Sequence, residues 1–85
     1  MITMGQAPGD RQAAVTREGY ERLRDELTAL TTISRARISD RLREARAHGG
    51  EFADNLDLID ALEDQELLER RIATVEAALA AARVV

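Results

Sequence analysis

The chain has 85 residues and a formal net charge of −4, with no Cys, no Trp, one Phe and one Tyr. So few aromatic side chains exclude a large globular core, and the absence of Cys excludes both a disulfide framework and a thiolate metal site. No apolar run approaches the roughly 18 residues that span a bilayer, and no signal-peptide pattern opens the chain, so we expect a cytoplasmic protein with no membrane partner.

The first segment, residues 1–15, contains two glycines and a proline and shows no apolar period, which predicts a flexible leader. Thr16 then offers a helix N-cap. From about residue 17 to 47, apolar side chains recur at helical spacing, at Tyr20, Leu23, Leu27, Leu30, Ile33, Ile38, Leu42 and Ala45. The five-residue step from Ile33 to Ile38 indicates that the stripe slips there or is shared with Ala36 and Arg37.

A tip follows at residues 48–53, because Gly49 and Gly50 readily take the positive φ that ends a helix. A second helix is predicted over about residues 54–82, and Asp54 or a neighbour is expected to cap it. Its stripe is Leu58, Leu62, Gln65, Leu68, Ile72, Val75, Leu79 and Ala82. A turn this short makes the two arms antiparallel neighbours. The predicted fold is therefore all-α, a long antiparallel two-helix coiled-coil hairpin over residues 16–85.

Charge is distributed unevenly between the two predicted arms. Residues 35–46 hold five arginines against two acids, whereas residues 51–69 hold eight acids and no Lys or Arg. The simplest reading is that facing arms attract each other across the seam, and recognition of a partner is the alternative. The single histidine, His48, stands beside glycine, and we expect it to close the first helix rather than to serve as a ligand or base.

Four phrases of the chain resemble, in order and in one register, the Gre family of bacterial transcript cleavage factors. Residues 15–27 (VTREGYERLRDEL) are similar to the family's opening phrase, and residues 43–49 (REARAHG) to its approach to the tip. Residues 51–55 (EFADN) stand where the family has an Asp-Leu-Ser-Glu-Asn tip, and residues 69–76 (ERRIATVE) are similar to the return arm.

The resemblance implies that the hairpin enters the secondary channel of bacterial RNA polymerase. In that family the tip acids help to hold a second Mg²⁺, and the polymerase's own active site then cuts backtracked RNA near its 3′ end. The protein would thus be no enzyme itself. Carried over by position, the catalytic, metal-directed pair is Glu51 and Asp54, with Phe52 packing at the tip and Asn55 supporting the turn. Mg²⁺ would be held mainly by the polymerase, because one or two added carboxylates complete a site without forming a cage alone.

The arginines of the first arm have two readings. The same resemblance makes Arg37 and Arg41, which align at i, i+4, candidate contacts to RNA phosphates. The alternative is a solvated surface that pairs with the acids of the second arm.

The tip departs from the family pattern, so three functions stay open. The order of the two acids is reversed, Gly50 has no counterpart, and Ala53 replaces a serine. The first function is the cleavage-assisting arm, and the second is a channel-binding inhibitor without cleavage. The third is a plain coiled-coil association module that uses the stripe or the off-stripe Leu56 and Leu67.

The end of the chain suggests a continuation. Val84 and Val85 follow an alanine run without a capping glycine or a polar tail, which favours entry into a further segment, such as the family's second globular domain. An isolated two-helix hairpin buries little surface, so weak self-association at high concentration is also expected.

Overall fold

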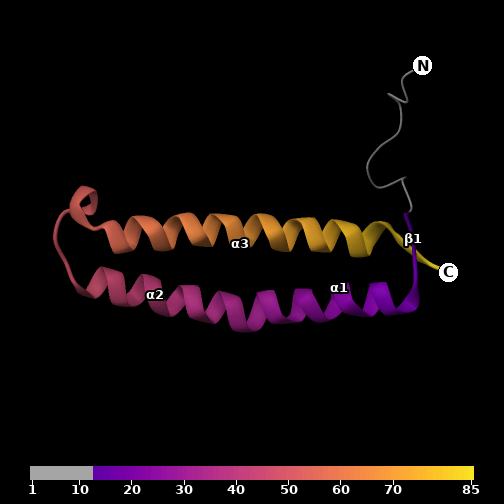
Figure 1. The fold of residues 1–85 in the computed structure, drawn as a ribbon. Coiled ribbons are helices and arrows are strands. Elements are labelled where there is room, and N and C mark those ends of the chain that lie inside the picture. The colour runs from indigo at the N-terminus through magenta and orange to yellow at the C-terminus, as the bar shows by residue number, and fades with distance from the viewer. Residues whose placement is uncertain (1–12) are drawn as a thin grey trace, which may run out of the picture.

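A computed structural model describes residues 13–85. Its elements are β1 (Ala13–Val15), α1 (Arg17–Ala29), the π-helical turn η2 (Leu30–Ser34), α2 (Arg35–Ala47), the 3-10 turn η3 (Phe52–Asp54), α3 (Leu56–Ala81) and β2 (Ala82–Val84). Figure 1 shows two arms side by side, with α1, η2 and α2 in one and α3 in the other. The principal-axis extents are 53 × 33 × 12 Å. The predicted antiparallel helical hairpin is confirmed.

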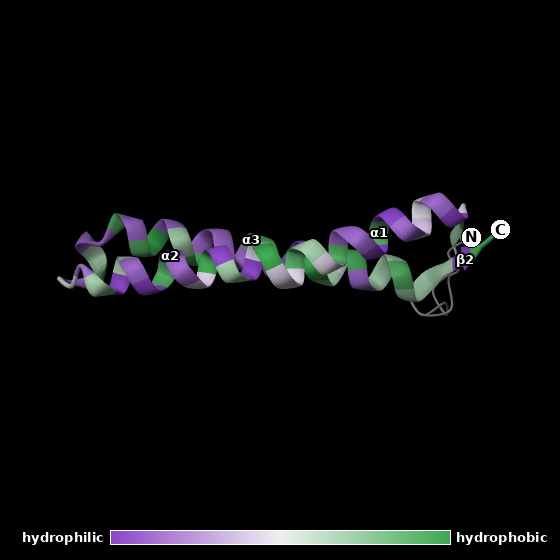
Figure 2. Ribbon diagram, turned by 90° about the horizontal axis from the view of Figure 1, so that it is seen from below, coloured by the Kyte–Doolittle hydropathy of each residue, from purple (hydrophilic) through white to green (hydrophobic). Residues whose placement is uncertain are grey.

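The seam between the arms holds the small core. Six apolar residues are buried: Leu42, Ala45, Ala61, Leu68, Ile72 and Val75. All except Ala61 lie on the predicted stripes. No residue of α1 is buried, and Tyr20, Leu23 and Leu27 are half-buried there. Figure 2 shows the same asymmetry, since the C-terminal part of α3 is largely apolar while α1 beside it is mostly polar.

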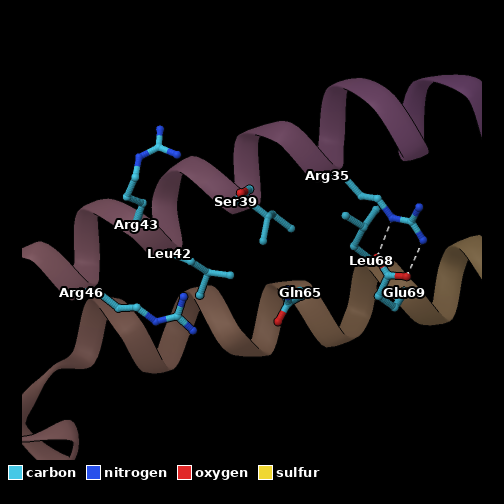
Figure 3. A pocket seen from close by; sticks show the side chains of 9 residues that line it. Arg35, Ser39, Leu42, Arg43, Arg46, Gln65, Leu68 and Glu69 are labelled. Atoms are coloured by element: carbon cyan, nitrogen blue, oxygen red, sulfur yellow. Dashed lines mark hydrogen bonds and ion pairs between the residues drawn. The ribbon is translucent and has the colours of Figure 1, made fainter.

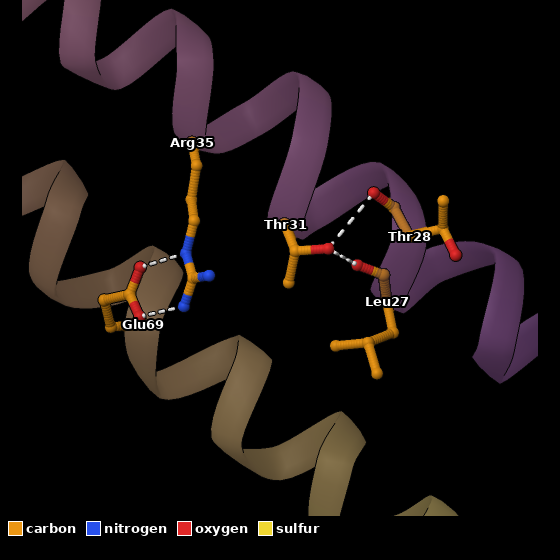
Figure 4. A network of polar contacts seen from close by, with 5 residues as sticks. All are labelled: Leu27, Thr28, Thr31, Arg35 and Glu69. Carbon is orange, nitrogen blue, oxygen red and sulfur yellow. Dashed lines mark hydrogen bonds and ion pairs between the residues drawn. The ribbon is translucent and has the colours of Figure 1, made fainter.

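The slip predicted between Ile33 and Ile38 occurs as a π-helical turn that lies earlier in the chain, at Leu30–Ser34. Its signature is the Arg35 backbone N–H, which donates to the carbonyl of Leu30, five residues back. The threonine hydroxyls of this region bond to the helix backbone: Thr31 to Leu27 O at 2.8 Å and Thr32 to Thr28 O at 2.6 Å. Figure 4 shows Thr31 aimed at this pair of carbonyls. Hydroxyls bonded to carbonyls four residues back compete with the regular ladder and bend helices, which favours the wider turn here.

The π-turn corrects the predicted stripe at one position. Ile33, predicted to lie in the seam, is 53% exposed. Thr31 and Ser34 are half-buried there in its place, so the seam passes through small polar residues at this turn. In the opposite arm Gln65, also predicted on the stripe, is exposed. Ile33 precedes the five-residue step of the first stripe, and Gln65 is the polar member of the second stripe.

Helix ends differ slightly from the prediction. Thr16 is the N-cap of α1, and its hydroxyl accepts from Gly19 N at 3.0 Å, as expected. The second helix begins at Leu56 rather than near residue 54, because Phe52–Asp54 form a separate 3-10 turn and Asn55 is the N-cap. It ends at Ala81, one residue earlier than predicted.

A short parallel strand pair closes the base of the hairpin and was not predicted. Ala13–Val15 pairs with Ala82–Val84, with Val15 opposite Val84, and Val85 N donates to Val15 O at 2.9 Å. Parallel strands need a long crossover connection, and here the whole hairpin is that connection. Residues 13–15 therefore belong to the folded unit rather than to the leader predicted for residues 1–15. The rest of that leader, residues 1–12, lies outside the described residues.

Ion pairs join the two arms along their length. Within residues 13–85, three pairs cross the seam: Arg35 with Glu69, Arg41 with Asp64, and Arg71 with Glu26. The first and third are bidentate. The first two join the basic stretch of the first arm to the acidic stretch of the second, as the simplest reading of the charge asymmetry predicts, whereas Arg71–Glu26 has the opposite polarity. Within residues 13–85 no helix combines the length and apolar character needed to cross a membrane.

Candidate functional site

The tip of the hairpin is built by two consecutive glycines. Helix α2 ends at Ala47, and His48 is its C-cap in helical conformation. Gly49 and Gly50 follow with φ of 70° and 88°, values that L side chains rarely adopt. Gly49 N donates to Arg46 O at 3.1 Å, which closes the helix end. The chain therefore reverses here and leaves Glu51 in extended conformation at the outer side of the turn.

The two candidate carboxylates lie on one short turn. Glu51 precedes the 3-10 turn Phe52–Asp54 and Asp54 ends it, and Asp54 N donates to Glu51 O at 3.0 Å. Both residues are exposed. Neither carboxylate forms an ion pair or a side-chain hydrogen bond with any other residue of the described chain. The predicted pair is thus brought together at the far end of the rod and is open to an external partner.

Asn55 ties the tip to both arms. Its Nδ2 donates to Ala45 O of α2 at 2.9 Å, and its Oδ1 accepts from Leu58 N in the first turn of α3 at 3.0 Å. Asn55 was predicted to support the turn, and in the structure its side chain connects the turn to both arms through these two hydrogen bonds. Phe52 differs from its prediction, because its side chain is 58% exposed rather than packed at the tip.

The two tip carboxylates do not belong to any larger metal-ligating group among residues 13–85. Among residues 13–85 no group of three or more His, Cys, Asp or Glu side chains is placed to hold a metal. Mg²⁺ keeps several waters and needs only one or two carboxylates when other ligands come from a substrate or a partner. Two unengaged carboxylates fit that arrangement. The remaining ligands would have to belong to another molecule.

The two arginines predicted as RNA contacts differ in their surroundings. Arg41 donates to Asp64 across the seam at 2.5 Å, and this hydrogen bond is the main cause that raises the pKa of Arg41 above its ordinary value. Arg37 is exposed and has no ion pair within the described chain. Arg41 therefore follows the cross-paired reading, while Arg37 remains open to solvent.

A basic groove beside the seam was not predicted. It encloses about 530 Å³ between α2 and α3, with Leu42 and Leu68 among its lining residues. Arg43 and Arg46 border it, as Figure 3 shows, and Gln65 lies on its α3 side. The available signal was Gln65 itself, a polar residue at a stripe position, which is exposed rather than packed in the seam.

Comparison with known proteins gives matches over most of the chain. The family of GreA and GreB described as "Transcription elongation factor, N-terminal" matches residues 13–84. The transcription elongation factor GreA of Amoebophilus asiaticus is 44% identical over 70 residues, which cover 82% of this chain and 44% of that protein.

Two further curated relatives are GreA of Chlorobium phaeovibrioides and of Methylococcus capsulatus. The first is 40% identical over 82% of this chain and 43% of its own length. The second is 41% identical over 84% of this chain and 44% of its own length. The chain thus spans less than half the length of the curated relatives it matches.

Proposed function

The chain belongs to the Gre family of transcription elongation factors, whose N-terminal domain it matches, and on that premise we propose that it assists RNA cleavage by bacterial RNA polymerase. The hairpin would enter the polymerase secondary channel and bring its tip to the active site. The observation that carries the proposal is the placement of two carboxylates without ion-pair partners, Glu51 and Asp54, at the end of a long two-helix hairpin whose principal-axis extents are 53 × 33 × 12 Å. Such a shape suits a narrow channel.

The chemistry divides between the two proteins. Glu51 and Asp54 would add oxygen ligands to a Mg²⁺ held mainly by the polymerase, and the bound ion would activate a water as nucleophile. The hairpin itself would therefore have no turnover, and the polymerase would cut backtracked RNA near its 3′ end. Arg37, exposed on α2, would contact RNA phosphates, whereas Arg41 would first have to leave Asp64. The setting would be the bacterial cytoplasm.

The test uses a stalled, backtracked bacterial elongation complex and the full-length protein. Wild-type protein is expected to shorten the RNA from its 3′ end in the presence of Mg²⁺. The double substitution Glu51→Ala with Asp54→Ala is expected to reduce that cleavage by at least about 100-fold, since misplacing a catalytic group by 1 Å already costs about that factor. Its helical content should stay unchanged, because both residues are exposed.

The matched control removes two acids of the same arm that lie away from the tip. Asp60→Ala with Glu63→Ala changes the net charge equally, and both residues are exposed on α3. This control is expected to cleave like the wild type. Cleavage that survives the double substitution at the tip would contradict the assignment of Glu51 and Asp54.

Two specific observations favour the other functions. The two successive positive-φ glycines lengthen the tip relative to the family pattern, which favours a channel-occupying inhibitor. That protein would slow initiation or elongation in the same assay without cutting RNA. Leu56 and Leu67 are 69% and 60% exposed on α3, which favours an association module. An association module would leave transcription unchanged, and its average molecular mass in light scattering would rise with protein concentration.

A further inference from the structure

We propose that Asn55 is the positioning residue of the tip carboxylates, and that the tip requires an amide there rather than a carboxylate. The consequence for cleavage rests on the proposed function. The consequence for the order of the loop rests on the tip geometry alone.

Three segments of the tip meet at this one residue. The side chain donates to Ala45 O of α2 and accepts from Leu58 N of α3, and the backbone N–H donates to Phe52 O of the 3-10 turn at 3.1 Å. Among residues 13–85, the next polar link between the arms is the Arg41–Asp64 pair, farther along the rod. The Asn55–Ala45 bond is therefore the cross-arm hydrogen bond nearest the tip loop.

The two ends of the loop are held very differently. At one end Gly49 and Gly50 have no side chains, and nothing would meet a side chain built on either of them. At the other end Asp54 directly precedes Asn55, and its backbone bond to Glu51 O keeps both acids on one turn. Because glycine has the greatest backbone freedom, the position of the acids is set from the Asn55 side.

The partner on α2 explains why an amide is needed. Ala45 lies in the last four residues of α2, whose carbonyls have no partner within the helix. Of the side chains that cap helices well, only asparagine carries both an acceptor and N–H donors. Aspartate at position 55 would still accept from Leu58 N but carries no donor for Ala45 O. Serine has one hydroxyl on a shorter side chain, so when it accepts from Leu58 N it does not supply the second, longer arm with which Asn55 reaches Ala45 O. Capping and cross-arm bonding can therefore be separated by substitution.

The first experiment measures backbone ¹⁵N relaxation of the 85-residue chain with Asn55→Asp, Asn55→Ser and no substitution. We expect order parameters of residues 49–54 to fall from about 0.85 to below about 0.6 in both variants, while the first turn of α3 stays ordered. The serine variant controls for the charge that aspartate adds. Asp57→Asn, an exchange of the same two groups two residues away on α3, should leave the loop unchanged. Loop order parameters equal to those of the wild type in both variants would overturn the proposal.

The second experiment measures RNA cleavage by the full-length protein over a Mg²⁺ titration. Both Asn55 variants are expected to cleave about 100-fold more slowly and to need at least about tenfold more Mg²⁺ for half-maximal rate. Their competition with wild-type protein for polymerase should be unchanged, which a general loss of fold would not allow. Wild-type cleavage by the variants, at every Mg²⁺ concentration, would sink the positioning role. If the wild type itself fails to cleave, the proposed function fails, and the relaxation data still decide whether Asn55 holds the loop.

Discussion

Deleting Thr32 is expected to turn the π-helical turn into regular helix and to leave the hairpin intact. A π-turn accommodates one residue more than an α-turn, so removing one residue from Leu30–Ser34 restores the regular count. The seam residues on either side, Leu27 and Ile38, then keep facing α3. Thr32 itself is exposed, and its only side-chain bond in the described chain is to Thr28 O.

The matched control deletes Ala73 from the middle of α3, where the helix is regular and the residue is exposed. That deletion rotates the following segment by about 100° and shifts it by about 1.5 Å. Val75, 1% exposed, would then leave the seam, and burial of such a side chain is worth about 1.5–3 kcal/mol. For a chain of this size, the loss corresponds to a fall in melting temperature of about 6–24 °C.

Thermal unfolding followed by far-ultraviolet circular dichroism distinguishes the two deletions. The Thr32 deletion should melt within about 4 °C of the wild type, which is less than 1 kcal/mol for a domain of this size. If both deletions lower the melting temperature equally, the π-turn does not contain an extra residue that the helix can lose, and the reasoning is refuted.

Two further outcomes follow from burial and charge. Ile72→Ala, at 2% exposure, should lower the free energy of unfolding in urea by about 2–5 kcal/mol, whereas Leu67→Ala, at 60% exposure, should change it by less than about 0.5 kcal/mol. Hydrogen bonds from arginines of the opposite arm lower the pKa of Glu26 and Glu69 below their ordinary value of 4.5. A carboxylate whose pKa is lowered in the folded state stabilises the fold at pH values above the unfolded-state pKa of 4.5, and this stabilisation is lost as the pH falls below it. The melting temperature should therefore drop below pH 4.5. The drop should be smaller in the double variant Glu26→Gln with Glu69→Gln.

Local patterns were sufficient to predict the hairpin. Apolar spacing, the cap at Thr16 and the paired glycines each act through nearby residues, so the sequence alone displays them. The π-turn was only half visible. The five-residue step from Ile33 to Ile38 indicated an irregularity, but the turn lies at Leu30–Ser34. Its form depends on whether hydroxyls such as that of Thr31 occupy backbone carbonyls of the preceding turn. The strand pair could not be predicted from the sequence. Three residues are too few to show an alternating pattern, and Val15 pairs with Val84, which lies at the other end of the hairpin in sequence.

The candidate site shows the same division between local and distant contacts. Glu51 and Asp54 were identified through family resemblance, and their exposure follows from the glycine turn beside them. The bond of Asn55 to Ala45 involves a backbone oxygen of the other arm, which no residue pattern reports. Arg37 and Arg41 differ in their contacts for a similar reason. The register in which the two arms face each other decides which of these arginines bonds to Asp64.

The division of contacts between the two arms and the tip bears on where function can reside. The stability of the hairpin comes from the seam, the cross-arm ion pairs and the helix caps, none of which uses the side chains of Glu51, Phe52 or Asp54. Phe52, which lies between the two carboxylates, adds little to the stability of the fold, because it is 58% exposed and buries little apolar area. These exposed side chains, on a turn that Asn55 connects to both arms, are therefore the ones that the proposed function assigns to the partner.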